Sequence, residues 1–105
     1  MTSNIPYNTT WRPTCNKMVL KAVRVKNNKP VSVGNITLLT GYLISFTQDI
    51  DLANYAREFG AKNNLIKADF SQHMTVIMVV TPILSYKVAI FDHDIPNLLA
   101  QSIKV

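Results

Sequence analysis

The chain has few of the residues that small proteins use for cross-links or cofactor-binding loops. It contains one cysteine and three glycines among 105 residues. Cys15 therefore has no partner within the chain for a disulfide or for a zinc site built from cysteines. No P-loop, GxGxxG or HExxH motif occurs, and three glycines leave little for a phosphate-cradling loop. These absences exclude a disulfide scaffold and the common nucleotide-binding motifs, and we expect no cofactor.

Long hydrophobic runs are also missing. The longest apolar stretch, residues 74–86, is interrupted by Thr81 and Pro82 and is shorter than the about 20 residues that span a bilayer. The first residues, MTSNIPYNTTWRP, have no basic start and no apolar segment, so they do not resemble a secretory signal. The sequence therefore predicts no membrane association and, by default, a cytoplasmic location.

The composition is that of a folded domain, with 48% hydrophobic and 16% charged residues. A chain of this length is close to the usual size of one domain. Residues 1–16 are rich in Asn, Thr and Pro, which favours turns and extended backbone. We therefore predict an extended or flexible N-terminal arm over 1–16 and a single α+β domain over 17–105.

Positive charge is concentrated at one end of the chain. All six acidic residues lie at or after Asp49, so the first 48 residues carry six basic and no acidic side chains. Such asymmetry can mark a surface for nucleic acid or for an acidic protein. It is also typical of a solvated face, which the lack of an arginine-rich run favours. The basic residues concerned are Arg12, Lys17, Lys21, Arg24, Lys26 and Lys29.

The first half of the domain is predicted to be β-rich. Residues 17–26 fit either a strand or a helix, and we predict a strand because three valines would share one face and 27–30 is a turn signal. These valines are Val19, Val23 and Val25. Residues 31–46 are interrupted by Gly34 and Gly41, which leaves open two short strands or one strand with a bulge.

The clearest helix is predicted over residues 49–60. Thr47 or Asp49 would cap its first turn, and Gly60 would end it in a left-handed conformation. One apolar stripe would pack on the sheet, and it consists of Leu52, Tyr55, Ala56 and Phe59.

After the helix, apolar residues alternate with polar ones from Ile66 toward Val80, and Ala68 and Phe70 are among the apolar ones. From Thr75 onward the residues on both faces of the expected strand are apolar. This pattern predicts a strand that enters the centre of the domain. Residues 86–91 would be its partner strand. Pro96 would begin a short helix, or 103–105 would form a last strand. Together, these elements predict an antiparallel sheet of about five strands with one helix packed on a face.

Asp92, His93 and Asp94 bring together the ligand types of a divalent cation. Consecutive side chains on extended backbone point to opposite faces, however, and no further His or Cys lies nearby in the sequence. A polar turn that ends a buried strand is therefore the preferred interpretation, and we expect no metal.

Asp69, Ser71 and His73 contain the residue types of a hydrolase triad. Alternate residues on a strand lie about 7 Å apart, and no nucleophile elbow surrounds Ser71. We therefore interpret this segment as a solvated strand edge and predict no catalytic residues.

The segments ADFSQHMTVIMVV and SYKVAI, together with the preceding ISFTQDIDLANYAREFG, resemble small β-rich domains of the PrcB-like protease-complex family. The resemblance covers about residues 42–91. It differs from the family pattern at Leu84-Ser85-Tyr86, where a Gly-Gly-Tyr turn is usual. The resemblance implies a non-enzymatic module that associates with proteases or other proteins, with Asp69 and Ser71 as structural turn residues.

The leading functional hypothesis is a small protein-interaction module, a regulator or inhibitor associated with a protease. Loops on a rigid scaffold are where such function is presented. The predicted contact residues are Pro82, Ile83, Leu84, Ser85, Tyr86, Asp92, His93 and Asp94.

Three further expectations stay open. A nucleic-acid-binding protein would use Trp11 or Tyr7 for stacking on bases and Lys17, Lys21, Arg24, Lys26 and Lys29 for phosphates. A metal-dependent enzyme would use Asp92, His93 and Asp94. Exposed strand edges would permit a homodimer.

Overall fold

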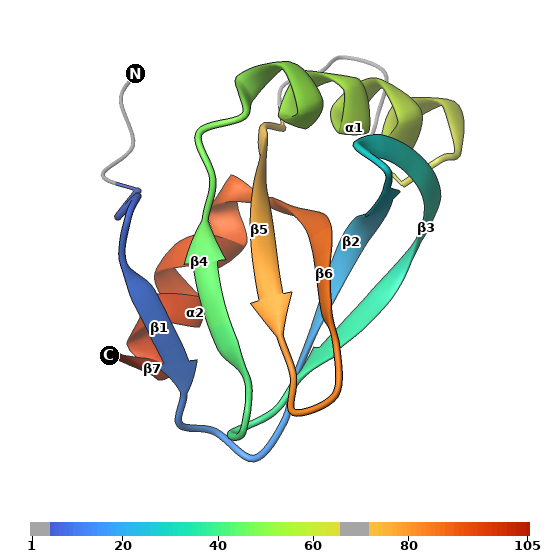
Figure 1. Ribbon diagram of the computed structural model, residues 1–105. Helices are drawn as coiled ribbons and strands as arrows, with labels where there is room; N and C mark the ends of the chain where they lie inside the picture. The colour runs from blue at the N-terminus through green and yellow to red at the C-terminus, as the bar shows by residue number, and fades with distance from the viewer. Residues whose placement is uncertain (1–4, 66–71) are drawn as a thin grey trace.

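The structure is a computed structural model and describes residues 5–65 and 72–105. In these ranges seven strands form one antiparallel sheet, and two α-helices and one short 3₁₀ helix accompany it (Figure 1). The strand order is β3-β2-β6-β5-β4-β1-β7. The strands are β1 (Thr10–Pro13), β2 (Met18–Lys26), β3 (Lys29–Leu38), β4 (Leu43–Phe46), β5 (Met74–Val80), β6 (Ser85–Phe91) and β7 (Ser102–Lys104). The helices are α1 (Ile50–Lys62), η1 (Asp92–Asp94) and α2 (Ile95–Ala100).

The predicted α+β class and the antiparallel sheet are confirmed, but about five strands and one helix is too few. The additional elements are β1, β7 and α2, all near the ends of the chain. Thr10–Pro13, expected to be part of an extended or flexible arm, is a strand between β4 and β7. At the C-terminus, the short helix and the last strand that we weighed as alternatives both occur, one after the other.

β5 and β6 occupy the middle of the sheet and are buried on both faces. Ile77, Val79, Val88 and Ile90 belong to one core cluster, to which α2 contributes Ile95 and Leu98. The alternate residues belong to a second cluster beneath α1, and they are Met74, Val76, Ala89 and Phe91. This confirms the expectation that the segment from Thr75 onward crosses the centre of the domain. The predicted strand positions Ile66, Ala68 and Phe70 lie outside the described residues.

Helix α1 lies across one end of the sheet and contacts β2, β3, β5 and β6 (Figure 1). Of the two predicted caps, Thr47 and Asp49, Asp49 is the one that caps the helix, because its Oδ1 accepts a hydrogen bond from the Leu52 N–H at 3.0 Å. The predicted end was wrong: Gly60 is buried within the helix, and the C-cap is Asn63. The buried stripe includes Ala53 and Gly60, whereas Tyr55 is exposed.

The β2–β3 hairpin confirms the predicted strand over residues 17–26. Asn27 and Asn28 form its turn with φ of 53° and 60°, a left-handed conformation that asparagine tolerates. The predicted valine face is partly confirmed: Val23 is fully buried and Val25 packs against the core cluster beneath α1, whereas Val19 is exposed. The alternate residues Met18, Leu20 and Ala22 belong to the other core cluster. Of the two alternatives for residues 31–46, two separate strands occur, β3 and β4. The register of the hairpin shifts between Arg24 and Val25, near the start of β3 and not at Gly34.

Neither α-helix in the described ranges has the length and hydropathy needed to cross a lipid bilayer.

We expect Asp49→Ala to lower the free energy of unfolding by about 0.5–2 kcal/mol, because the substitution removes the acceptor for the Leu52 N–H. Chemical denaturation measures this loss. Asp49→Asn is the matched control, since asparagine caps helices as well as aspartate does. Equal losses in the two variants would show that the carboxylate matters for another reason.

Candidate functional site

The loop between β5 and β6 is a short turn held by Thr81. The Thr81 N–H donates to the Leu84 carbonyl at 2.7 Å. The Thr81 hydroxyl accepts the N–H groups of Ile83 and Leu84 at 3.3 and 3.1 Å and donates to the Leu84 carbonyl at 3.0 Å. Pro82 fixes one backbone angle within the turn. The sequence Thr-Pro-Ile-Leu therefore forms a turn whose own hydrogen bonds determine its shape.

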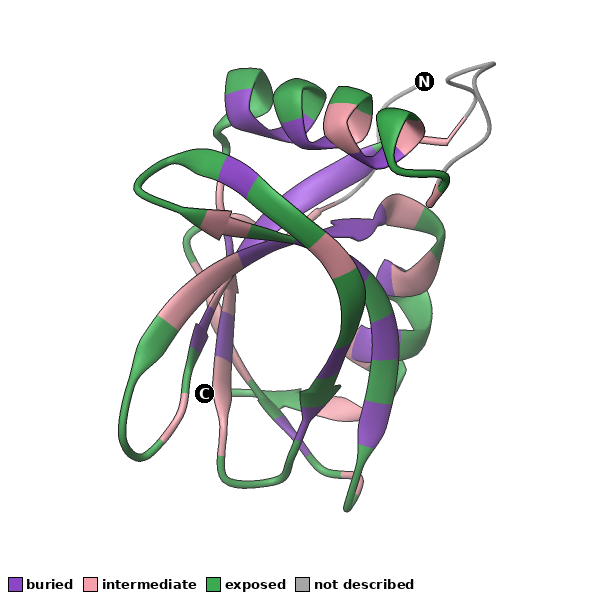
Figure 2. Ribbon diagram, turned by 90° about the vertical axis from the view of Figure 1, so that its right-hand side faces the viewer, coloured by how far each residue is buried: buried purple, intermediate pink, exposed green. Residues whose placement is uncertain are grey.

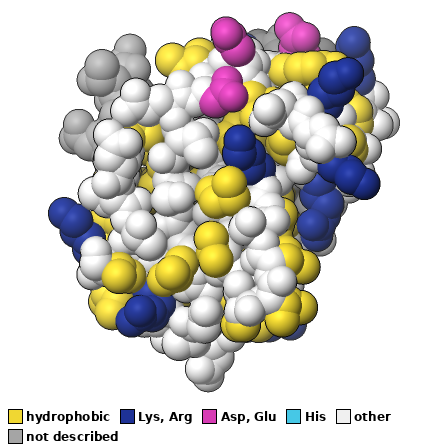
Figure 3. Space-filling model, viewed as in Figure 1, with side chains coloured by type: hydrophobic (Ala, Val, Ile, Leu, Met, Phe, Trp, Pro, Cys, Tyr) yellow, Lys and Arg dark blue, Asp and Glu magenta, His cyan; other side chains and the backbone are white. Residues whose placement is uncertain are grey.

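This turn exposes large apolar side chains. Ile83 is 89% exposed, Leu84 51% and Val80 41%. A shallow hollow of about 330 Å³ lies beside them. We call this region the hairpin surface and define it as Tyr42, Val80, Thr81, Pro82, Ile83, Leu84 and Tyr86. Hydrophobic side chains gather at this end of the molecule in Figure 3. Contiguous exposed apolar groups of this kind often mark interaction sites.

Tyr42 belongs to the hairpin surface although it is far away in the sequence. Its N–H donates to the Leu39 carbonyl at 3.0 Å, and the next residue, Leu43, pairs with Val80 of β5. This pairing places Tyr42 beside Thr81 and Pro82. The sequence analysis missed Tyr42, because only the pairing of β4 with β5 brings it to this site.

Tyr86 connects the hairpin surface to a group of basic residues. The Arg24 guanidinium lies 6.0 Å from the centre of the Tyr86 ring, within the range of a cation–π interaction. Partial burial raises the pKa of the Tyr86 hydroxyl, and nearby Tyr42 raises that pKa further, whereas Arg24 lowers it. Tyr42, Tyr86 and Arg24 are therefore electrostatically coupled.

Arg24, Lys26 and Lys29 form a basic cluster beside Tyr86. Arg24 pairs with Val88 of β6, and both Val88 and Tyr86 contribute to the same core cluster. Lys26 pairs with Lys29 across the β2–β3 hairpin. None of the three forms an ion pair with a residue in the described part of the chain. On the face shown in Figure 3, the acidic side chains gather over α1, at the opposite end from the hairpin surface.

The second predicted contact segment, Asp92–Asp94, lies far from the hairpin surface. It is the 3₁₀ helix η1, at the other end of β6. The seven residues of β6 separate the two segments by about 20 Å. The predicted contact residues therefore divide into two separate groups, with Pro82–Tyr86 at one end of the strand and Asp92–Asp94 at the other.

The three side chains of Asp92–Asp94 point in different directions. Asp92 accepts a hydrogen bond of 2.5 Å from the hydroxyl of Thr75, whereas the His93 ring stacks on Phe91 with centroids 5.1 Å apart. Asp94 lies 3.7 Å from the His93 Nε2. Among the described residues, no group of three potential metal ligands comes together. The Thr75–Asp92 hydrogen bond closes the end of β6 against β5, whereas His93 and Asp94 contact only their neighbours in the chain in these interactions.

Asp92 also lines a cavity of about 420 Å³ at the start of α1. Several of its polar side chains have partners within the fold: Thr75 donates to Asp92, Asp49 caps α1, and His73 lies 2.7 Å from the Arg57 guanidinium. The buried hydroxyl of Thr47, which also lines the cavity, has no hydrogen-bond partner among the described residues. The other two residues of the considered triad, Asp69 and Ser71, lie outside the described residues. We place the candidate site at the hairpin surface and not in this cavity, because the hairpin surface exposes large apolar side chains.

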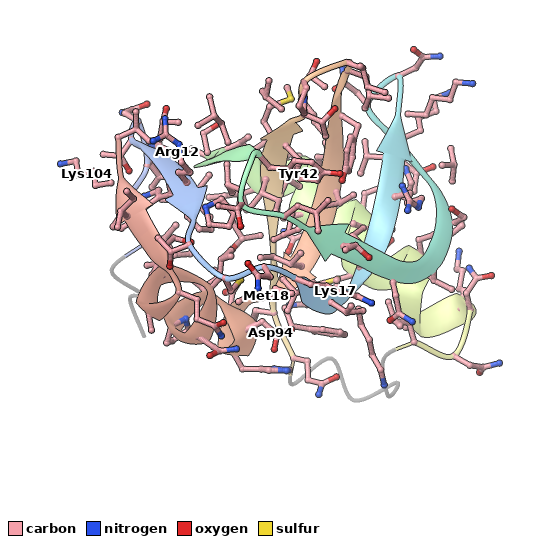
Figure 4. All side chains as sticks on the ribbon, turned by 90° about the horizontal axis from the view of Figure 1, so that it is seen from below. Arg12, Lys17, Met18, Tyr42, Asp94 and Lys104 are labelled. Atoms are coloured by element: carbon pink, nitrogen blue, oxygen red, sulfur yellow. The ribbon has the colours of Figure 1, made fainter. Side chains whose placement is uncertain are left out.

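The residues of the nucleic-acid hypothesis are spread over the sheet. Trp11 lies on β1, which β4, β5 and β6 separate from β2. Its ring packs against the core, and its Nε1 donates to the Thr9 hydroxyl at 2.9 Å. Lys21 lies on the opposite face of β2 from Arg24, because the two are three positions apart on a strand and successive side chains alternate between the faces. In Figure 4, Lys17 lies well away from Arg12 and Lys104, which are together at the other side of the view.

In comparisons with protein-family models, curated proteins and solved structures, the chain matches none of them. The resemblance to the PrcB-like family therefore stays a prediction.

We expect Arg24→Met to raise the pKa of Tyr86 further, because it removes the positive charge that favours the phenolate. Ultraviolet titration of the tyrosines measures this pKa, and Tyr86→Phe identifies the signal. The raised pKa also makes stability pH-dependent. Its contribution is complete below about pH 10, the unfolded value, and is lost as pH rises through the folded-state pKa. An unchanged Tyr86 pKa in Arg24→Met would contradict the coupling.

Proposed function

We propose that this protein is a non-enzymatic interaction module that binds a protein partner through the hairpin surface. The observation that supports this most strongly is Ile83, a large apolar side chain with 89% exposure at the tip of a hydrogen-bonded turn. A side chain that a rigid turn already holds in place loses little conformational freedom on binding. The turn therefore offers Ile83 and Leu84 as anchors for a pocket on the partner.

The hollow beside Ile83 supplies the complementary feature. Tyr42 and Tyr86 flank it, and tyrosines combine a large apolar area with a polar tip. Tyrosine and arginine are enriched among the residues that dominate binding energy at interfaces. An apolar side chain of the partner would fill this hollow, and Ile83 would insert into a pocket on the partner.

Charge determines which kind of partner fits. The basic cluster of Arg24, Lys26 and Lys29 borders Tyr86, and the described acidic residues belong to α1, its cap and the far end of β6. A partner with acidic residues around an apolar contact is therefore attracted, and a basic one is repelled.

A protease, or a protein that acts with one, is the partner class we propose to test first. The basis is the sequence resemblance over residues 42–91, which includes β5, β6 and the turn between them. A panel of purified proteases, assayed with and without the protein, addresses this directly.

We expect Ile83→Asp to abolish partner capture without changing the melting temperature. The substitution places a charge at the centre of an apolar contact, but Ile83 contributes almost nothing to the core. The measurement compares proteins captured from the source cells by the unmodified and substituted chains, with quantitative mass spectrometry.

Ile50→Asp is the matched control, because Ile50 is also a well-exposed isoleucine but lies at the start of α1, away from the hairpin surface. The control should retain the partner. Capture that survives Ile83→Asp but fails with Ile50→Asp would place the interaction at the other end of the molecule.

The nucleic-acid hypothesis predicts binding to DNA or RNA in place of a protein partner, and it can be tested separately. Phosphate contacts would give DNA or RNA binding that weakens steeply between about 50 and 200 mM salt. Because Trp11 and the basic residues do not share one face, we expect no measurable binding at the lower salt concentration. Tight binding there, lost on Arg24→Glu, would favour nucleic acid over an acidic protein.

A further inference from the structure

The two edges of the sheet differ in how they are protected. At one edge, β7 has three residues and includes Lys104. At the other, β3 has ten residues, and most of its residues are exposed (Figure 2). Short strands and charged side chains protect an edge from pairing with another chain, whereas a long uncharged edge attracts it. β3 is therefore the edge open to a further strand.

β3 lies in the longest stretch of the chain without charge. The nearest charged residues are Lys29 and Asp49, so residues 30–48 contain neither acidic nor basic side chains. Two copies of the protein, each with a net charge of +5, repel one another over most approaches. Along β3 this repulsion is at its weakest, which favours a second copy as the strand that pairs here.

Only part of β3 is free to pair. Lys29, Pro30 and the register shift beside Val25 disturb its first residues, and proline lacks the N–H that a ladder needs. Residues 32–38 follow without such an interruption. In the described part of the chain, no strand and no other backbone group hydrogen-bonds to the outer side of this segment.

We propose that β3 pairs antiparallel with β3 of a second copy, about a two-fold axis at Asn35. Asn35 is the middle residue of 32–38, so this register uses the whole segment. Val33 then faces Thr37 of the second copy, and Asn35 faces its own equivalent. A two-fold interface of this kind is closed, and it joins two sheets into one without leading to fibres.

Charge agrees with this register. Lys21 lies beside Asn35 on the neighbouring strand β2. In the dimer, three strand spacings separate the two copies of Lys21, which is about 14 Å. That distance exceeds the screening length of about 8 Å at physiological salt. The dimer also carries two hairpin surfaces, so it would bind a multivalent partner with increased avidity. The pairing itself does not depend on the proposed function.

Cysteine cross-linking tests the pairing and its register. In a Cys15→Ser background, we expect Asn35→Cys to form a disulfide-linked dimer under mild oxidation, because residues facing each other on antiparallel strands lie within disulfide range. Thr37→Cys is the matched control on the same exposed strand. It should not cross-link, since its equivalent in the second copy lies four residues farther along the ladder.

Sedimentation velocity of the unmodified protein provides the second measurement. We expect dimer that increases with concentration and is weakened by Asn35→Lys, because like charges directly opposite one another are destabilising. A monomer at every concentration would overturn the proposal. Cross-linking of Thr37→Cys as readily as of Asn35→Cys would overturn the proposed register.

Discussion

The structure depends on the pairing of β5 with β6 at the centre of the sheet. Residues of both strands alternate between two core clusters, so this hairpin connects the layer beneath α1 to the layer that contains α2. Burying one large aliphatic side chain contributes about 1.5–3 kcal/mol, and these two strands bury many of them. The two buried strands hold both ends of the turn at Thr81–Leu84 in place, and the turn has hydrogen bonds of its own. The exposure of Ile83 is therefore a fixed property of the fold.

The two ends of the hairpin differ in chemistry. At one end, Thr75 and Asp92 form a short hydrogen bond that closes β6 against β5, and Asp49 nearby caps α1. At the other end, Ile83 and Leu84 face solvent, and Arg24 lies over Tyr86 without a carboxylate partner in the described residues. The first end uses its polar residues for structure. The second leaves both apolar area and positive charge available for binding.

Local features of the sequence predicted part of this arrangement. The helix cap at Asp49 and the strand that is apolar on both faces after Thr75 depend on residues that are close together in the sequence, and both were predicted. The buried face of α1 was only partly predicted, because Ala53 and Tyr55 lie on opposite flanks of the apolar stripe and the sheet decides which flank is buried. β1 was not predicted, and β7 was only one of two alternatives for the C-terminus, since strands this short are stabilised by partners far away in the sequence. Pro82–Tyr86 are adjacent in the chain and could be proposed as contact residues from the sequence, whereas Tyr42 and the contact of Arg24 with Tyr86 required the strand order.

The most direct test of the hairpin surface is photocrosslinking in the cells that make the protein. A photoreactive amino acid is placed at position 83 in one chain and at position 50 in another. Both positions are exposed, and they lie at opposite ends of the molecule. A covalent adduct of defined mass that forms from position 83 and not from position 50 is the predicted result. An adduct from position 50 alone, with none from position 83, would contradict the assignment of the binding surface.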